Sequence, residues 1–333
     1  MSAIPNIDFQ AWFQNDQSQK LDLVDKLRRA CETHGFFQLT NHGIPQALLD
    51  AALVQSKAFF DLPIEIKEKY DKNIGRYNRG YERFRAQNFE KRTEGDLKEG
   101  YYFGLDIPEH HPAVVAKSFN LGPNKYPEDV EDAAGFRAIV DSYIDAMLEL
   151  AKNIVRAISM TLGLPDDWVS DFFETPISTL RLLHYPPQAS DASEYERGIG
   201  AHTDFGAITI LLQDMVGGLQ VWDRQNARWA DVVPERGALV VNLGNMMMRW
   251  TNDAYLSNLH RVINKTGQER YSIPFFFSGN PDFLVQCLEG KTKAKYPPIK
   301  VGDWIAGRYA DTYGDGKVET AQDLSVELDA GLL

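Results

Sequence analysis

Hydrophobic residues in the first half of the chain recur at steps of three and four, which is typical of amphipathic helices. This spacing predicts helices over residues 21–31 and 48–60. A longer run of the same period covers 136–162 and ends at the Gly-Leu-Pro sequence 163–165, where glycine and proline interrupt a helix. We expect this long helix to support a sheet.

After Pro176 the pattern shortens into β-like runs separated by Gly, Asn, Asp or Pro. The runs lie at about 178–185, 207–213, 219–222, 229–233, 238–243, 260–264 and 270–277. Short strands at this frequency favour a sandwich or a jelly roll. The predicted fold class is therefore mainly β with flanking α: a double-stranded β-helix (jelly roll) core preceded by an amino-terminal helical and mixed region.

The pattern divides the chain into an amino-terminal region, 1–120, and a region of support helix plus jelly roll, 121–333, with its core at about 176–285. A length of 333 residues fits about two domains, although a single β architecture can reach ~250 residues. Segment 75–104 is rich in Arg, Lys, Tyr and Gly and lacks a period. It is interpreted as an irregular lid over an active-site mouth or, equally, as a surface loop.

Composition narrows the possible partners. The net charge of -12 repels phosphate backbones and anionic membrane surfaces, so we expect no nucleic-acid partner and no membrane partner. The sequence has no run of 18 apolar residues and no signal-peptide pattern at its start. Two cysteines give no disulfide framework. We expect a cytoplasmic protein that acts on a small molecule, with its oligomeric state left open.

Three residues have the spacing of a metal site. His202 and Asp204 are two positions apart, and side chains at i and i+2 of an extended chain share a face. His260 begins a β-branched run distant in sequence and supplies a third ligand. Two histidines and one carboxylate leave about three positions of an octahedron open, as in non-haem Fe(II) enzymes. A closed structural zinc site would use cysteines, and Cys31 and Cys287 lack the spacing for it.

Arg270 and Ser272 repeat the i, i+2 arrangement within the run RYSIPFFF at 270–277. A guanidinium beside a hydroxyl suits a carboxylate, because it offers bidentate charge-assisted hydrogen bonds and one further donor. The inferred ligand is a small dicarboxylate. A lone His-x-Asp is more often structural, but its combination with His260 and Arg-x-Ser, flanked by AHTDFG, GGLQVW and NLHRV, favours a functional site.

These motifs resemble the isopenicillin N synthase-like branch of the Fe(II)/2-oxoglutarate-dependent dioxygenases, over nearly the full chain. Fungal thymine 7-hydroxylase-like members are particularly similar. The further segments that carry the resemblance are IPNIDF (4–9), GFFQLTNHGIP (35–45), FFDLP (59–63), NRGY (78–81), KEGYYFG (98–104) and RLLHYPP (181–187).

The resemblance implies a role for each matching residue. His202, Asp204 and His260 would be the iron ligands, and Arg270 and Ser272 would hold the distal carboxylate of 2-oxoglutarate. Tyr185 matches a family tyrosine that adds a hydrogen bond to that carboxylate. Leu183 departs from the Asn of many plant relatives, which removes a secondary polar contact. The cofactors implied are Fe(II), 2-oxoglutarate as cosubstrate and O₂.

Candidates for contact with the prime substrate lie in two places. Arg79, Tyr81 and Tyr102 belong to segment 75–104, and we expect one of them to touch the substrate. Phe205 and Phe276 are either ordinary core residues or an apolar wall beside the iron, on which a planar substrate could stack. His184 points away from Tyr185 on a regular strand, so we place it outside the site.

The predicted function is an Fe(II)- and 2-oxoglutarate-dependent oxygenase that releases succinate and CO₂. Hydroxylation of a C–H bond is the first choice of outcome, and desaturation, cyclisation and demethylation remain open. A nucleobase such as thymine, an amino-acid derivative and a secondary-metabolite scaffold all fit as substrate. Two alternatives are an oxidase of the isopenicillin N synthase type, which needs no oxoacid, and a non-catalytic jelly-roll binding protein.

Overall fold

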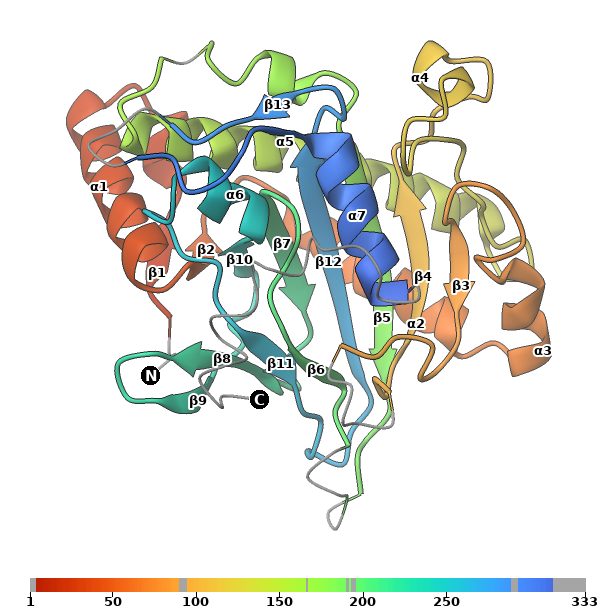
Figure 1. Ribbon diagram of the computed structural model, residues 1–333. Helices are drawn as coiled ribbons and strands as arrows, with labels where there is room; N and C mark the ends of the chain where they lie inside the picture. The colour runs from red at the N-terminus through yellow and green to blue at the C-terminus, as the bar shows by residue number, and fades with distance from the viewer. Residues whose placement is uncertain are drawn as a thin grey trace.

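The computed structural model describes residues 4–89, 95–165, 167–189, 192, 196–288 and 293–313. Its largest element is an eight-stranded sheet, antiparallel except where its first two strands pair in parallel (Figure 1). The strand order is β1 (Asn6–Asp8), β2 (Phe36–Thr40), β10 (Leu239–Leu243), β7 (Ile208–Gln213), β12 (Arg270–Gly279), β5 (Ile177–Tyr185), β4 (Glu99–Gly104) and β3 (Gly80–Glu82).

A second sheet of four strands lies against this one. Its order is β6 (Ile199–His202), β11 (His260–Val262), β8 (Leu219–Asp223) and β9 (Arg228–Asp231). One cavity is lined both by the main-sheet strands β5, β7 and β12 and by β6, β8 and β11. The predicted jelly-roll core is confirmed, with the cavity between its two sheets. A short pair, β13 (Leu284–Val285) and β14 (Ile299–Lys300), lies outside it.

Helices cover the outer face of the main sheet. The long helix α5 (Ala133–Thr161) packs against β7 and β12, with α1 (Gln17–Thr33) and α2 (Gln46–Phe60) packed on it. Figure 1 shows α5 behind the main sheet and α7 (Val301–Tyr313) in front of β12. Asp132 caps α5 by accepting a hydrogen bond from the Gly135 backbone. The short helices are α3 (Ile64–Lys67), α4 (Pro112–Val115) and α6 (Asn245–Trp250).

The three predicted helices and the seven predicted strand runs are confirmed, with bounds shifted by a few residues. The support role of the long helix is confirmed as well. The sequence did not indicate strands β1 to β4 and β6 or helix α7. No helix in the described part of the chain is both long and apolar enough to cross a membrane.

Segment 75–104 requires a correction. It contains strand β3 and ends with strand β4, both in the main sheet, and every residue of both strands is buried. Irregular structure remains at 75–79 and between the two strands, and positions 90–94 lie outside the described residues. The lid stays a prediction for these shorter stretches. The division at residue 120 also stays a prediction, since the strands of both regions share one sheet.

Candidate active site

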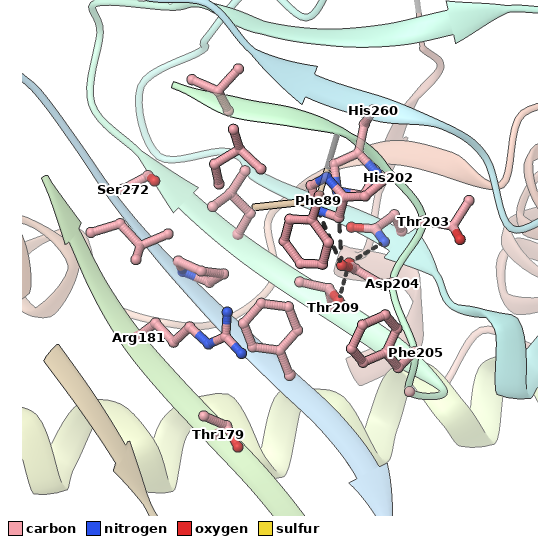
Figure 2. A pocket seen from close by; sticks show the side chains of 18 of the residues that line it. Phe89, Thr179, Arg181, His202, Thr203, Asp204, Phe205, Thr209, His260 and Ser272 are labelled. Atoms are coloured by element: carbon pink, nitrogen blue, oxygen red, sulfur yellow. Dashed lines mark hydrogen bonds and ion pairs between the residues drawn. The ribbon is translucent and has the colours of Figure 1, made fainter. Parts of the chain in front are cut away.

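The three predicted metal ligands lie together in the cavity (Figure 2). His202 ends β6 and His260 begins β11, directly opposite each other in the ladder. Asp204 lies in the connection to β7, so the two ligands do not share one extended strand as the i, i+2 spacing predicted. The Nε2 atom of each histidine is 3.8 Å from Asp204 Oδ1, and the three donor atoms lie within 4.8 Å of one another.

Backbone carbonyls orient both imidazoles. Nδ1 of His202 lies 2.8 Å from the Gly200 carbonyl oxygen, and Nδ1 of His260 lies 3.3 Å from that of Asn258. Because a carbonyl only accepts, each Nδ1 carries the proton and donates it. The lone pair of each ring is therefore on Nε2, which faces Asp204 and the shared centre.

The Asp204 carboxylate is fixed by two neutral donors. Its Oδ2 accepts hydrogen bonds from Thr209 Oγ1 at 2.5 Å and from Asn242 Nδ2 at 2.7 Å, which leaves Oδ1 toward the histidines. Burial alone would raise the pKa of Asp204, but its electrostatic interactions with His260 and His202 and these two donors outweigh it and lower the pKa. A carboxylate in this form is ready to bind a metal ion.

The imidazole of His202 is in the form that a metal requires. Burial, together with the neighbouring His260, lowers the pKa of His202 to about 3, so the ring is neutral at physiological pH. Two imidazoles and one carboxylate match the donor set of non-haem Fe(II) sites that keep positions open for other ligands. The described residues form no other cluster of this kind, and neither cysteine lines the cavity.

Arg270 brings a positive charge into the same cavity, and its side chain is fully buried. Nε donates to the Gly217 carbonyl at 2.5 Å, Nη1 to Ser272 Oγ at 3.2 Å and Nη2 to Gln213 Oε1 at 3.3 Å. Its Cζ lies 4.7 Å from the centre of the Tyr185 ring. Among the described residues, no carboxylate lies within ion-pair distance of this guanidinium. Because a buried charge is stable only when paired, the site fits an anionic ligand.

The two central strands present alternate residues to the cavity, as a period of two requires. The lining residues are Ile177, Thr179, Arg181, Leu183 and Tyr185 on β5 and Arg270, Ser272, Pro274, Phe276 and Ser278 on β12. The expectation that Arg270 and Ser272 share a face is confirmed. His184 lies on the opposite face, where its ring nitrogens contact Glu99 and Glu269, and it is outside the cavity as predicted.

The residues predicted to touch the substrate divide into two groups. Phe205 and Phe276 line the cavity. Arg79, Tyr81 and Tyr102 do not line the cavity, so the structure contradicts the expectation that one of them touches the substrate. Their side chains bind polar partners within the protein instead. Arg79 donates to Asn124 Oδ1 at 2.9 Å, Tyr81 to Glu99 at 2.6 Å and Tyr102 to Glu82 at 2.5 Å.

Three cavity residues were not singled out from the sequence. Arg181 of β5 donates from Nη2 to the hydroxyl of Tyr309 on α7 at 3.1 Å. The Phe89 ring stacks on the His202 imidazole, with centroids 4.3 Å apart and planes 6° from parallel. Arg181 has the same parity as Tyr185 along the strand, so the pattern already placed it on the cavity face. Phe89 and Tyr309 carried no comparable signal.

Comparison with known families defines the class. Residues 176–279, which contain the triad, Arg270 and Ser272, match the 2OG-Fe(II) oxygenase superfamily. Residues 4–129 match the family described as the N-terminal region of the non-haem dioxygenase in morphine synthesis. The chain therefore belongs to the 2OG-Fe(II) oxygenases and is a non-haem Fe(II)- and 2-oxoglutarate-dependent dioxygenase that uses O₂ as its second cosubstrate.

Individual relatives agree with this assignment. A 2-oxoglutarate-Fe(II) type oxidoreductase of Emericella nidulans is 48% identical over 94% of this chain and 91% of its own length. A 2-oxoglutarate-dependent dioxygenase of Monascus ruber is 38% identical over 93% and 95%. The thymine 7-hydroxylase of Neurospora crassa, solved with α-ketoglutarate, superposes with a TM-score of 0.82 at 29% identity, covering 92% of this chain and 95% of that one.

Proposed function

We propose that this dioxygenase hydroxylates a C–H bond of a small organic molecule. His202, Asp204 and His260 would hold the Fe(II), and Arg270 and Ser272 would bind the distal carboxylate of 2-oxoglutarate, with Tyr185 packed against the guanidinium. The overall reaction joins R–H, O₂ and 2-oxoglutarate to give R–OH, succinate and CO₂. Fe(II) with its bound cosubstrate supplies the oxidation.

The residues of the chain bind, orient and exclude water. Asp204 contributes the negative charge of the metal site through Oδ1, while Thr209 and Asn242 keep the carboxylate from rotating. The Arg270 guanidinium neutralises the distal carboxylate, and its hydrogen bonds to Gly217 and Gln213 set its plane in advance. Apolar side chains make up most of the rest of the lining and keep bulk water from the reacting centre.

The single observation that carries these roles is the buried Arg270 charge in the cavity that also holds the triad. The guanidinium calls for an anion, but a substrate carboxylate could supply it as well as 2-oxoglutarate, so succinate formation, and not Arg270, separates this proposal from an oxidase of the isopenicillin N synthase type. A non-catalytic binding protein would have no need to direct three donor atoms at one point. Nor would it need hydrogen bonds that fix the orientation of the His202 ring and the Asp204 carboxylate.

The choice of hydroxylation over desaturation, cyclisation or demethylation depends on the prime substrate. In the Neurospora relative solved with thymine, the bound molecule is a small planar ring. A small molecule of this size suits the present cavity, whose lining includes the aromatic rings of Phe89, Phe205 and Phe276.

A cytoplasmic location remains part of this proposal, since Fe(II) and two free cysteines suit a reducing compartment.

The test is a panel of small planar molecules incubated with the enzyme, Fe(II), 2-oxoglutarate and O₂. We expect one class to raise succinate formation and to gain a single oxygen atom in a 1:1 ratio with succinate. A product that loses two hydrogens with the same succinate yield would replace hydroxylation by desaturation. O₂ uptake without succinate would establish the oxidase alternative, and no O₂ uptake with any compound would establish the binding-protein alternative.

A further inference from the structure

The cavity contains a second cationic site at Arg181, in the middle of β5 and four residues before Tyr185, which ends the strand. We propose that Arg181 and Tyr309 bind the carboxylate of the prime substrate, and that this substrate is a planar, aromatic or heteroaromatic carboxylic acid. The inference builds on the proposed function, because it names the substrate class of the same active site.

Arg181 is separate from the predicted 2-oxoglutarate site. In the ladder Arg270 is opposite Tyr185, whereas Arg181 is opposite Tyr102 on the other side of β5. Four residues along a strand, at ~3.3 Å per residue, place the backbones of Arg181 and Tyr185 roughly 13 Å apart. Figure 2 shows the Arg181 guanidinium directed into the cavity that holds the triad, with Ser272 farther along. The two cations therefore serve different ligands.

The Arg181 guanidinium is held in one orientation. Its Cζ lies 4.5 Å from the centre of the Tyr102 ring and 4.8 Å from that of the Phe276 ring. Its Nη2 donates to the Tyr309 hydroxyl at 3.1 Å. A guanidinium packed on aromatic rings donates along its planar edge, which matches the two oxygens of a carboxylate. Tyr309 adds a hydroxyl at the same edge, so the pair resembles the Arg270 and Ser272 pair in its chemistry.

The layer behind Arg181 supports this orientation and is rich in positive charge. Tyr102, on which Arg181 packs, donates to the buried carboxylate of Glu82 at 2.5 Å. Two ammonium groups bind the same carboxylate, Lys72 at 2.5 Å and Lys98 at 3.1 Å. Arg181 also lowers the pKa of Glu82. At least three cationic side chains therefore interact electrostatically with this one carboxylate. An anion at the cavity face of Arg181 would be attracted by these cations.

The remainder of the lining suits a flat apolar body. Phe276 lies beside Arg181, and Phe89 and Phe205 lie near the triad with their rings 6.3 Å apart. A planar ring gains from offset or edge contacts with such side chains. A neutral ring of the same shape would fill the same space but would bring no charge to Arg181. Sites built for a charged group discriminate strongly against an analogue that lacks it.

The experiment compares benzene-, pyridine- and indole-carboxylic acids with their primary amides and with thymine and uracil. Binding to the protein loaded with Mn(II) and 2-oxoglutarate is measured by isothermal titration calorimetry, and turnover with Fe(II) is measured as product formed per succinate. For the wild type we expect binding of at least one acid and roughly 30-fold weaker binding, or more, of its amide. Arg181→Met should remove that preference, and Arg181→Lys should restore part of it. Tyr309→Phe should weaken acid binding and leave amide binding unchanged.

Arg76→Met, at an exposed position of the same residue type, is the matched control and should behave as the wild type. Calorimetric 2-oxoglutarate binding by each variant separates the two proposals and verifies folding. Suppose that 2-oxoglutarate binds normally to the wild type and to Arg181→Met. If no acid then binds, or if amides or nucleobases bind as well as the acids, the carboxylate inference is overturned and the proposed function stands. If the wild type binds no 2-oxoglutarate, the proposed function itself fails.

Discussion

Thr209 donates a 2.5 Å hydrogen bond to Oδ2 of Asp204, the outer oxygen of the metal-binding carboxylate. The contact crosses from β7 to the connection that follows β6. It holds Oδ1 at equal distances of 3.8 Å from the two histidine Nε2 atoms. The sheet therefore determines not only where the ligands are but also which carboxylate oxygen faces the metal.

The first prediction concerns this contact. Thr209→Val keeps the shape of the side chain and removes the hydroxyl, so Asp204 gains freedom to rotate. We expect Fe(II) affinity to fall by roughly 10- to 100-fold, the usual effect of losing a hydrogen bond to a metal ligand. Metal titration under anaerobic conditions measures it. Thr33→Val, at an exposed threonine that does not line the cavity, is the control, and equal metal affinity in all three proteins would show that the contact has no role.

The second prediction concerns cosubstrate binding. Arg270→Ala removes the buried guanidinium and leaves the distal carboxylate without a partner. Because truncating one member of a buried charge pair costs ~2–5 kcal/mol, 2-oxoglutarate affinity should fall by roughly 30-fold or more. Calorimetry with Mn(II) in place of Fe(II) measures this without turnover. Unchanged 2-oxoglutarate affinity in Arg270→Ala would remove Arg270 from the proposed role.

The third prediction compares how much Arg270 and Ser272 contribute to 2-oxoglutarate affinity. Ser272→Ala removes one hydroxyl 3.2 Å from Arg270 Nη1 and keeps the charge. The expected loss is about 1.5 kcal/mol, roughly tenfold in 2-oxoglutarate affinity, and so smaller than that of Arg270→Ala. The same calorimetric titration applies. A loss from Ser272→Ala that equals or exceeds the loss from Arg270→Ala would mean that the hydroxyl, and not the guanidinium, is the main anchor.

The fourth prediction concerns acid stability. Burial would raise the pKa of Glu82, but the charges of Lys98 and Lys72 outweigh it, so its folded-state pKa lies below the ordinary value of 4.5. A carboxyl group with a lowered folded pKa contributes stability above its unfolded pKa and loses it as the pH falls toward the folded pKa. Glu82→Gln leaves two buried ammonium groups without their carboxylate, which should cost ~3–5 kcal/mol at pH 7.

Urea unfolding of the wild type and Glu82→Gln at several pH values checks this. The difference in the free energy of unfolding should be largest at neutral pH and should narrow below about pH 4.5, where the unfolded wild type takes up a proton that the folded protein does not. Glu65→Gln, on an exposed helical position, is the control. A difference that stays constant down to pH 3 would rule out the ion-pair explanation.

The sequence predicted most of the metal and cosubstrate site because it depends on local rules. Alternation on a strand places Arg270 and Ser272 on one face, and it also places His184 on the face opposite Tyr185. Periodicity likewise predicted the three longest helices covering the sheet and seven of the strands after Pro176, since each must bury one face. The same alternation put Arg181 on the cavity face, although its role depended on partners that only the fold supplies.

What sequence could not supply was long-range pairing. Tyr309 reaches Arg181 from α7, 128 positions away, and nothing local indicates that contact. Tyr81 and Tyr102 had the composition of a substrate loop, but β3 and β4 add to the main sheet and direct these hydroxyls to Glu99 and Glu82. Buried carboxylates and lysines from β3, β4 and the preceding segments created a polar core that hydrophobic periodicity does not predict.

The central claim is that His202, Asp204 and His260 form one metal site on which 2-oxoglutarate binding depends. It is tested most directly by anaerobic calorimetry of the metal-free protein, titrated first with Fe(II) and then with 2-oxoglutarate. The account predicts one Fe(II) per chain, one 2-oxoglutarate that binds tightly only after the metal, and the loss of both in His202→Ala. A His202→Ala protein that binds Fe(II) and 2-oxoglutarate as tightly as the wild type would contradict it.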